Sequence, residues 1–298
     1  MQRGQVFCKK DPFEIIDCAD CGFVHLNPIP QENELKKFYE KQYYEEKRDK
    51  LKVPKKVVKE KLWYEKVVWK DRLDVFDENV RKYPKRLLDV GSGYGYFLKF
   101  MKGNCWKVTG VEPSPIACKY AKSLNLEVFN ITIKEFKLQF KKQHFFDAIN
   151  LDSVLEHLPN PKEVLEISRD LLKNNGVIHV TVPNDFNLFQ LQANKVVSKP
   201  SWWIAIPDHI NYFNFETLEK LLEKASFEII LRTTSFPMEL FLLMGDDYIG
   251  NDEIGSLCHQ KRMNLELNLS NNVRRKLYQK LASLGLGREC IVYGKVPA

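Results

Sequence analysis

A glycine-rich turn is the first group of residues in this sequence whose types and spacing could do chemistry. The turn, residues 91–95, follows Asp89 at the end of a short apolar stretch and precedes a helical pattern. Glycines at such a place let backbone N–H groups approach a ligand without an intervening Cβ. Glu112 ends the next apolar stretch, 23 positions after Asp89, where a carboxylate can accept both hydroxyls of a ribose. This spacing favours a nucleoside-binding site over an ordinary strand-to-helix turn.

The spacing also limits which ligand of this kind the turn could hold. A dinucleotide site needs a third glycine inside the helix, and Tyr96 stands there instead. No Gly-Lys-Ser or Gly-Lys-Thr follows the turn, which excludes a P-loop. An acidic residue beside the turn suits a cationic ligand better than a phosphate.

Short apolar stretches and helical patterns alternate around this turn. Strand, helix and strand at this spacing are typical of a parallel sheet covered on both faces. The sequence therefore predicts an α/β fold with a Rossmann-like, doubly wound, mostly parallel sheet. We expect Asn160 to cap a helix that begins at Pro161, with Gly176 just beyond its last turn. The expected strands are 86–90, 108–112, 126–130, 146–151, 177–182, 227–233 and 289–294, and the other expected helices are 96–101, 115–124, 215–225 and 274–284.

Composition changes along the chain and predicts three regions. Residues 1–84 comprise a short, turn-rich, cysteine-containing segment and two or more amphipathic helices interrupted at Pro54. Residues 85–236 form the sheet-containing core, with an insertion at about 184–214. Residues 237–298 form a C-terminal extension.

Several stretches in order resemble the motifs of class I S-adenosylmethionine-dependent methyltransferases. They are Leu-Leu-Asp-Val-Gly-Ser-Gly-Tyr-Gly at 87–95, Gly-Val-Glu-Pro-Ser at 110–114, Asp-Ala-Ile at 147–149, Leu-Glu-His-Leu-Pro at 155–159, and 177–183 after Leu-Leu-Lys-Asn-Asn-Gly. The resemblance covers roughly residues 85 to 235. It implies S-adenosylmethionine as cofactor and S-adenosylhomocysteine as product.

The resemblance also implies which residues bind the cofactor. Asp89 and the glycine turn would hold its methionine part, Glu112 its ribose, and 130–132 its adenine, with 151–152 beside the transferred methyl. The expected cofactor-binding residues are Asp89, Gly91, Ser92, Gly93, Gly95, Glu112, Pro113, Asn130, Ile131, Thr132, Leu151 and Asp152.

Methyl transfer to a hydroxyl or a carbon acid also needs a base, and histidine is the side chain that titrates near neutral pH. His157 follows the fourth expected strand, at the carboxyl edge where open α/β sheets bind ligands; bracing the loop is its alternative role. Asp208 and His209 lie in a segment that resembles bacterial methyltransferases acting on sugars and small metabolites. We expect His209 to be the base with Asp208 orienting it, the alternative being a polar loop that leads to a helix cap at Asn214.

The same resemblance suggests a sugar, nucleotide-linked sugar or polysaccharide precursor as acceptor. Trp202 and Trp203 could stack on such a sugar or simply pack the insertion, and Tyr43 and Tyr44 could fold over the cofactor. Alternatives are an RNA or protein methyltransferase, or a non-catalytic S-adenosylmethionine-binding module. The residues at 150–153 lack the Asn/Asp-Pro-Pro-aromatic motif of adenine methyltransferases, and no cysteine follows a proline as in cytosine C5 enzymes. A nucleic-acid partner is therefore disfavoured.

The seven cysteines are odd in number and widely scattered, which argues against a disulfide framework. Cys18-x-x-Cys21 resembles the second half of a zinc ribbon found in many sugar methyltransferases, but the first pair is absent. Cys8 and His25 would complete an irregular set of four ligands. We therefore predict no metal site, although zinc at Cys18 and Cys21 stays an open alternative.

The net charge of +7 arises mainly in residues 36–86, which hold 18 Lys or Arg against 10 Asp or Glu. Because acidic residues alternate with these lysines, a solvated helical surface is the simplest interpretation. Steering of an anionic sugar nucleotide is the functional alternative. The start of the chain lacks a signal-peptide pattern, and no apolar stretch is long enough to span a membrane, so a cytoplasmic protein is expected.

Overall fold

A seven-stranded sheet forms the centre of the computed structural model, which describes residues 4–10, 12–31 and 53–297. The strand order is β10-β11-β8-β7-β4-β5-β6, and all strands are parallel except β11, which is antiparallel to both of its neighbours. This arrangement confirms the predicted α/β fold with a mostly parallel sheet. The strands are β4 (Arg86–Val90), β5 (Lys107–Val111), β6 (Val128–Phe129), β7 (Phe146–Asp152), β8 (Leu172–Pro183), β10 (Glu228–Thr233) and β11 (Glu289–Lys295).

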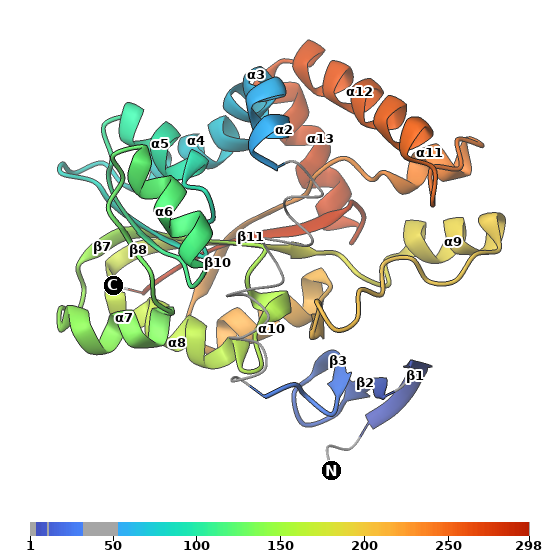
Figure 1. Cartoon of the computed structure of the whole chain (residues 1–298), viewed down its shortest axis with the longest axis horizontal. Coiled ribbons are helices and arrows are strands. Elements are labelled where there is room, and N and C mark those ends of the chain that lie inside the picture. Colours follow the sequence, from blue (N-terminus) through green and yellow to red (C-terminus); the bar gives the residue numbers. More distant parts are fainter. Residues whose placement is uncertain (1–3, 11, 32–52, 298) are drawn as a thin grey trace.

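Helices cover both faces of this sheet, as Figure 1 shows. One face packs against α4 (Trp69–Asn79), α5 (Tyr96–Gly103) and α6 (Pro115–Ser123), and its core includes Phe76, Leu98 and Met101. The other face packs against α7 (Ile133–Phe140), α8 (Pro161–Leu171) and α10 (Phe215–Lys224), with Phe136 and Leu218 in its core. Because both faces are buried, the strands read as apolar runs without polar alternation.

Two local predictions in this core are wrong. The helix capped by Asn160 ends at Leu171, and Gly176 lies inside β8 and not just beyond the helix. Backbone bonds from Asn175 N to Val296 O and from Val296 N to Gly176 O hold this segment to the end of the chain, so long-range pairing replaces a helical end. The expected helices also omit α7, which follows β6 and which Thr132 begins through a capping box with Glu135.

A second, smaller sheet lies at the N-terminal end of the chain, shown in blue in Figure 1. The order is β1-β2-β3-β9, all antiparallel, so the prediction that this segment consists of turns is wrong. Buried Ile15, Leu26 and Tyr212 join the N-terminal strands to the insertion. The strands are β1 (Gly4–Lys10), β2 (Phe13–Cys18), β3 (Phe23–Asn27) and β9 (Asn211–Tyr212).

Further helices precede and follow the sheet-containing core. The expected helices before the core are confirmed for the described part from residue 53, where Pro54 lies in the first turn of α2. Between α3 and α4 the chain is π-helical at Tyr64–Val68, a conformation frequent at functional sites. The remaining helices are α2 (Val53–Lys59), α3 (Lys61–Trp63), α9 (Leu188–Val197), α11 (Glu239–Leu243), α12 (Asp252–Asn268) and α13 (Asn271–Ser283), with a 3-10 turn at Leu155–His157.

Strand β11 comes from the C-terminal segment but lies between β8 and β10 in the main sheet. The C-terminal segment therefore contributes an inner strand to the core. Among the described residues, none of the helices has the length and apolar character needed to cross a membrane.

Candidate functional site

The glycine turn and Glu112 meet at the carboxyl ends of β4 and β5. Glu112 is 3% exposed, and its two carboxylate oxygens accept hydrogen bonds from the backbone N–H groups of Gly93 and Ser114, both at 2.8 Å. The Asn130 side chain donates to the carbonyls of Glu112 and Pro113 at 2.9 Å each. This arrangement fixes the Glu112 carboxylate beside the turn.

The turn itself needs glycine at two positions for different reasons. Gly91 has φ +70°, and a Cβ there would lie 2.8 Å from Val154 Cγ2 in the loop after β7. Gly95 has φ +76°, and a Cβ there would lie 2.6 Å from Leu126 Cδ1, which follows α6. Side chains at these positions would strain the backbone and push the turn away from its neighbours.

Polar groups between β4 and β7 form a chain of hydrogen bonds. Asn150 donates to Asp89 Oδ1 at 2.5 Å and accepts from Arg72 at 2.9 Å. Arg72 also donates to Asp152 Oδ2 at 2.9 Å and lies over the ring of Phe97. Arg72 therefore joins helix α4 to the sheet at the point where strand order reverses, which is where doubly wound folds bind their ligands.

The Asp89 carboxyl is 3% exposed, and this burial has an electrostatic consequence. Burial raises the pKa of Asp89 to about 7, although the hydrogen bond from Asn150 and the charge of Arg72 act in the opposite direction. A cationic ligand group beside Asp89 would favour the ionised form. The site is thus suited to a ligand with positive charge, as the acidic residue beside the glycine turn predicts.

The other predicted cofactor residues lie around the same edge of the sheet. Leu151 is fully buried in β7, and Asp152 ends that strand. Ile131 packs against the core, whereas the Thr132 hydroxyl is engaged in the capping box of α7. The Ser92 hydroxyl is buried and has no hydrogen-bond partner among the residues described, which leaves it available to a ligand.

The three predicted catalytic residues lie together between the loop after β7 and the insertion. His157 Nδ1 is 2.7 Å from the carbonyl oxygen of Asp208 and 3.6 Å from its carboxylate. The rings of His157 and His209 meet edge to face with centroids 5.1 Å apart. Glu156 joins them, and its backbone carbonyl accepts from Ile210 N at 2.7 Å. Trp202 and Trp203 of the insertion contact each other, and Tyr43 and Tyr44 lie outside the described residues.

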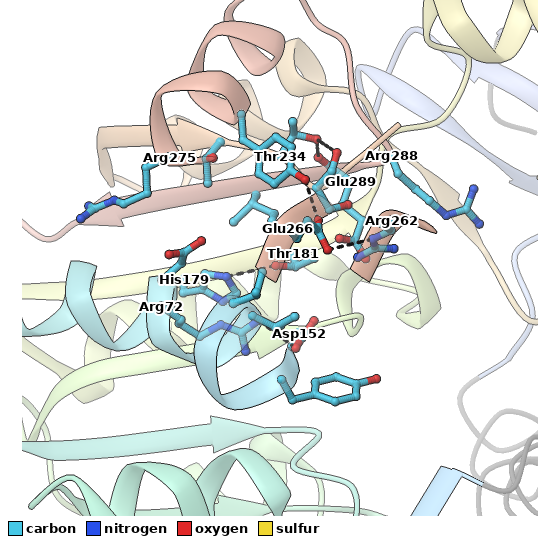
Figure 2. Close-up of a pocket in the computed structure, with 18 of the residues that line it drawn as sticks. Arg72, Asp152, His179, Thr181, Thr234, Arg262, Glu266, Arg275, Arg288 and Glu289 are labelled. Carbon is cyan, nitrogen blue, oxygen red and sulfur yellow. Dashed lines mark hydrogen bonds and ion pairs between the residues drawn. The ribbon is translucent and has the colours of Figure 1, made fainter. Parts of the chain in front are cut away.

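A pocket of about 460 Å³ opens beside Asp152. Figure 2 shows the labelled side chains gathered around it. Its lining comes from the strand ends of β8, β10 and β11, from the helical segment 63–75, and from the C-terminal helices. Asp152 and Arg72 belong both to this pocket and to the chain of hydrogen bonds that reaches Asp89, so the pocket adjoins that chain at the end of β7.

Buried charged side chains connect the N-terminal and C-terminal helices that line the pocket. Glu266 accepts from Trp63 Nε1 and from the Tyr278 hydroxyl, both at 2.6 Å, and from Arg262 at 3.3 Å. Arg274 is 1% exposed and donates to Asp71 and to the carbonyl of Lys66. The pocket wall therefore depends on both ends of the chain.

Of the predicted site residues, Asp152 lines this pocket, whereas His157, Asp208 and His209 do not. The other pocket residues were not identified from the sequence. The sequence contains one indication that Arg72 is special. This residue interrupts the apolar face that Trp69, Leu73 and Phe76 form on an amphipathic helix. No sequence feature identifies Glu266, since a single glutamate in a polar helix resembles solvated surface. Two other pocket residues are histidines: burial lowers the pKa of His179 well below its usual value, and His259 Nε2 lies 3.2 Å from Glu60.

The cysteine segment brings three metal-ligating side chains together in the small sheet. Ligand atoms of Cys18, Cys21 and His25 lie within 4.8 Å of one another. Cys21 N donates to Cys18 Sγ, and His25 is buried with Nδ1 2.7 Å from the Leu26 carbonyl and with no hydrogen-bond partner for Nε2 among the described residues. Two thiols and an imidazole suit zinc. Cys8 is not among these three, so the set differs from the four ligands considered from the sequence.

Comparisons with known proteins agree with this geometry. A family model described as "Methyltransferase domain" matches residues 64–231, more than half of the chain. Ubiquinone biosynthesis O-methyltransferases from Glaesserella parasuis and Pasteurella multocida are 32% and 35% identical over 114 residues, which is 34% of this chain and 47% of each relative. The chain thus spans about half the length of the curated relatives it matches.

Two solved structures share the fold. Burkholderia thailandensis 1,6-didemethyltoxoflavin-N1-methyltransferase, with bound 1,6-didemethyltoxoflavin and S-adenosylhomocysteine, is 13% identical with a TM-score of 0.53, covering 99% of this chain and 100% of its own. The plantazolicin methyltransferase, in complex with a triazolic desmethylPZN analog and S-adenosylhomocysteine, is 13% identical with a TM-score of 0.55, covering 90% and 97%. At this identity the likeness concerns the fold.

Proposed function

The chain belongs to the family of methyltransferase domains, and from this premise we propose that it transfers a methyl group from S-adenosylmethionine to a small-molecule acceptor. The observation that carries the proposal is the pocket beside Asp152, which adjoins the polar chain ending at Asp89. A volume of about 460 Å³ is within the usual range for small-molecule sites.

The residues around the glycine turn fit the methyl donor. Asp89 would hold its cationic methionine end, Glu112 its ribose hydroxyls, and the stretch from Asn130 to Thr132 its adenine. When bound, S-adenosylmethionine supplies an electrophilic methyl carbon on a positively charged sulfur. The chain's own task is to align the acceptor oxygen with that carbon, exclude water and remove the hydroxyl proton.

We propose His209 as the group that takes this proton, positioned with Asp208 and His157. Their close packing supports the assignment. His259 is the second candidate, because it lines the pocket and faces Glu60. The transfer balances when the acceptor O–H proton goes to the imidazole, the new C–O bond forms, and the C–S electron pair stays on sulfur.

A neutral, hydroxylated acceptor such as a sugar fits the pocket better than a polyanion. The lining is rich in polar groups, but Arg72, Arg262 and Arg288 each form an ion pair with a carboxylate. These arginines are thus already neutralised. A nucleotide-linked sugar remains within the proposal if its sugar occupies the pocket and its phosphates lie outside.

Binding and turnover assays test this proposal. Calorimetry with S-adenosylmethionine should show one site, and a labelled methyl donor should modify members of a panel of free sugars, nucleotide sugars and phenols. Absence of cofactor binding at millimolar concentration would overturn the enzymatic function. Modification of phenols but not of sugars would overturn the acceptor class.

Histidine variants separate the two candidate bases. His209→Ala should lower kcat by roughly 10²- to 10⁴-fold, the usual contribution of acid–base catalysis, while cofactor affinity stays nearly unchanged. His259→Ala should then keep most of the activity, and exposed His144→Ala serves as the matched control. Wild-type turnover in His209→Ala would remove His209 as the base.

A further inference from the structure

A group of metal-ligating side chains lies outside both the glycine turn and the cysteine segment. Glu156, His157 and His209 offer ligand atoms that all lie within 4.8 Å of one another. Glu156 and His157 belong to the 3-10 turn after β7, and His209 precedes β9 in the insertion. The backbone bond from Ile210 N to Glu156 O at 2.7 Å and the bonds from the Asn211 side chain to the carbonyls of Leu155 and Leu158 hold the two segments together.

The Glu156 carboxylate is buried, so its ionised form would be stabilised by a cation. Its side chain is 2% exposed, and its Oε2 has no hydrogen-bond partner among the residues described. The other oxygen, Oε1, is 3.8 Å from His157 Nε2. An ionised carboxylate buried in this manner is costly unless a cation or several donors compensate it.

The His157 ring is oriented as a metal ligand. Its Nδ1 is 2.7 Å from the Asp208 carbonyl, a distance at which Nδ1 donates its proton to that oxygen. The lone pair is then on Nε2, on the side of the ring that faces Glu156. Ligating histidines almost always donate their other N–H to a carbonyl or carboxylate in this way.

We propose that Glu156, His157 and His209 bind a divalent transition-metal ion, with zinc as the simplest choice. Two imidazoles and one carboxylate form a donor set that suits Zn²⁺ and related ions. Ligands at about 2.0–2.2 Å from one ion lie roughly 3–3.6 Å apart, so the three side chains, whose ligand atoms lie within 4.8 Å of one another, would draw closer together around the ion. Three protein ligands leave a coordination position for water or an acceptor oxygen.

In this site His209 would be a metal ligand and would not transfer a proton. A histidine nitrogen that binds a metal cannot accept a proton. The metal content of the active protein therefore decides whether His209 acts as the base or as a metal ligand. Because the test below measures binding without turnover, its failure and the failure of the proposed function are distinguishable.

Metal binding is best measured in a chain that lacks the thiolate cluster. In a Cys18→Ser, Cys21→Ser background, the chelator-treated protein should take up one equivalent of Zn²⁺ in calorimetry and mass spectrometry. Co²⁺ should give visible d–d bands without the near-ultraviolet charge-transfer band of thiolate ligands. No uptake at micromolar Zn²⁺ would overturn the proposal.

Single substitutions then assign the ligands. Glu156→Gln and His209→Ala should each weaken Zn²⁺ binding by more than the roughly 10- to 100-fold lost with an outer-sphere partner. Because Glu156→Gln removes a buried charge and keeps the shape, its metal-free melting temperature should equal or exceed that of the parent, and added Zn²⁺ should no longer raise it. His144→Ala should bind like the parent. Unchanged affinity in Glu156→Gln or His209→Ala would overturn the assignment.

Discussion

Asp89 shows how one buried residue can make ligand binding depend on pH. Its pKa is about 7 in the protein and 3.8 in a model compound, because burial disfavours the charged form. In the ligand-free protein the protonated form is thus favoured by folding. The contribution of this group to stability is present below pH 3.8 and is lost as pH rises through about 7.

Cofactor binding should have the opposite dependence, because a cationic methionine end favours ionised Asp89. The affinity for S-adenosylmethionine should increase about tenfold between pH 6 and pH 8, as the ionised fraction rises from about a tenth to about nine tenths. Asp89→Asn should bind more weakly and lose this dependence. Calorimetry at several pH values checks both expectations, and a flat profile in the wild type would contradict them.

At the scale of elements, Glu266 joins α12 to α3 and α13 through Trp63 and Tyr278. Glu266→Ala would leave Trp63 Nε1 and the Tyr278 hydroxyl without their acceptor, and we expect a loss of about 3 kcal/mol in the free energy of unfolding. The acceptor KM should rise because Trp63 and Tyr278 line the pocket. The Kd for S-adenosylmethionine should change little, since none of these groups contacts the glycine turn.

Chemical denaturation and steady-state kinetics measure these effects. Gln260→Ala, an exposed position on the same helix, is the matched control and should change stability by less than about 0.5 kcal/mol. An equal loss of cofactor and acceptor affinity in Glu266→Ala would show that the helices support the whole sheet edge and not the pocket alone.

At the scale of the whole molecule, the last strand makes the main sheet depend on the C-terminal segment. A chain ending at residue 236 lacks β11, which leaves the edges of β8 and β10 without the strand that pairs with both. This truncation should not fold, whereas a chain ending at Val296 keeps β11 and its bond to Gly176 and should fold normally. Circular dichroism and thermal melting of both truncations test this, and a cooperative transition in the shorter chain would contradict it.

Much of the core could be predicted because it depends on local patterns. The strand at Arg86–Val90 and the start of the helix at Pro161 agree with the structure, since a buried apolar run and an Asn-Pro cap are readable within a few residues. The three strands before residue 28 were not predicted, because we interpreted this segment as rich in turns. The last of them, β3, pairs with β9, and this pairing joins segments nearly 190 positions apart.

The sequence by itself determined the cofactor edge of this protein. The glycine turn, Asp89 and Glu112 are set by backbone geometry and by a fixed spacing along two successive strands, so their arrangement follows from local rules. Tertiary structure alone decided the other features. They are the hydrogen bonds that link Arg72 to Asp89, the pocket lined by helices from both ends of the polypeptide, and the cluster of Glu156 with two histidines. These features are contacts between distant segments, and their identity depends on burial and pairing that no local spacing encodes.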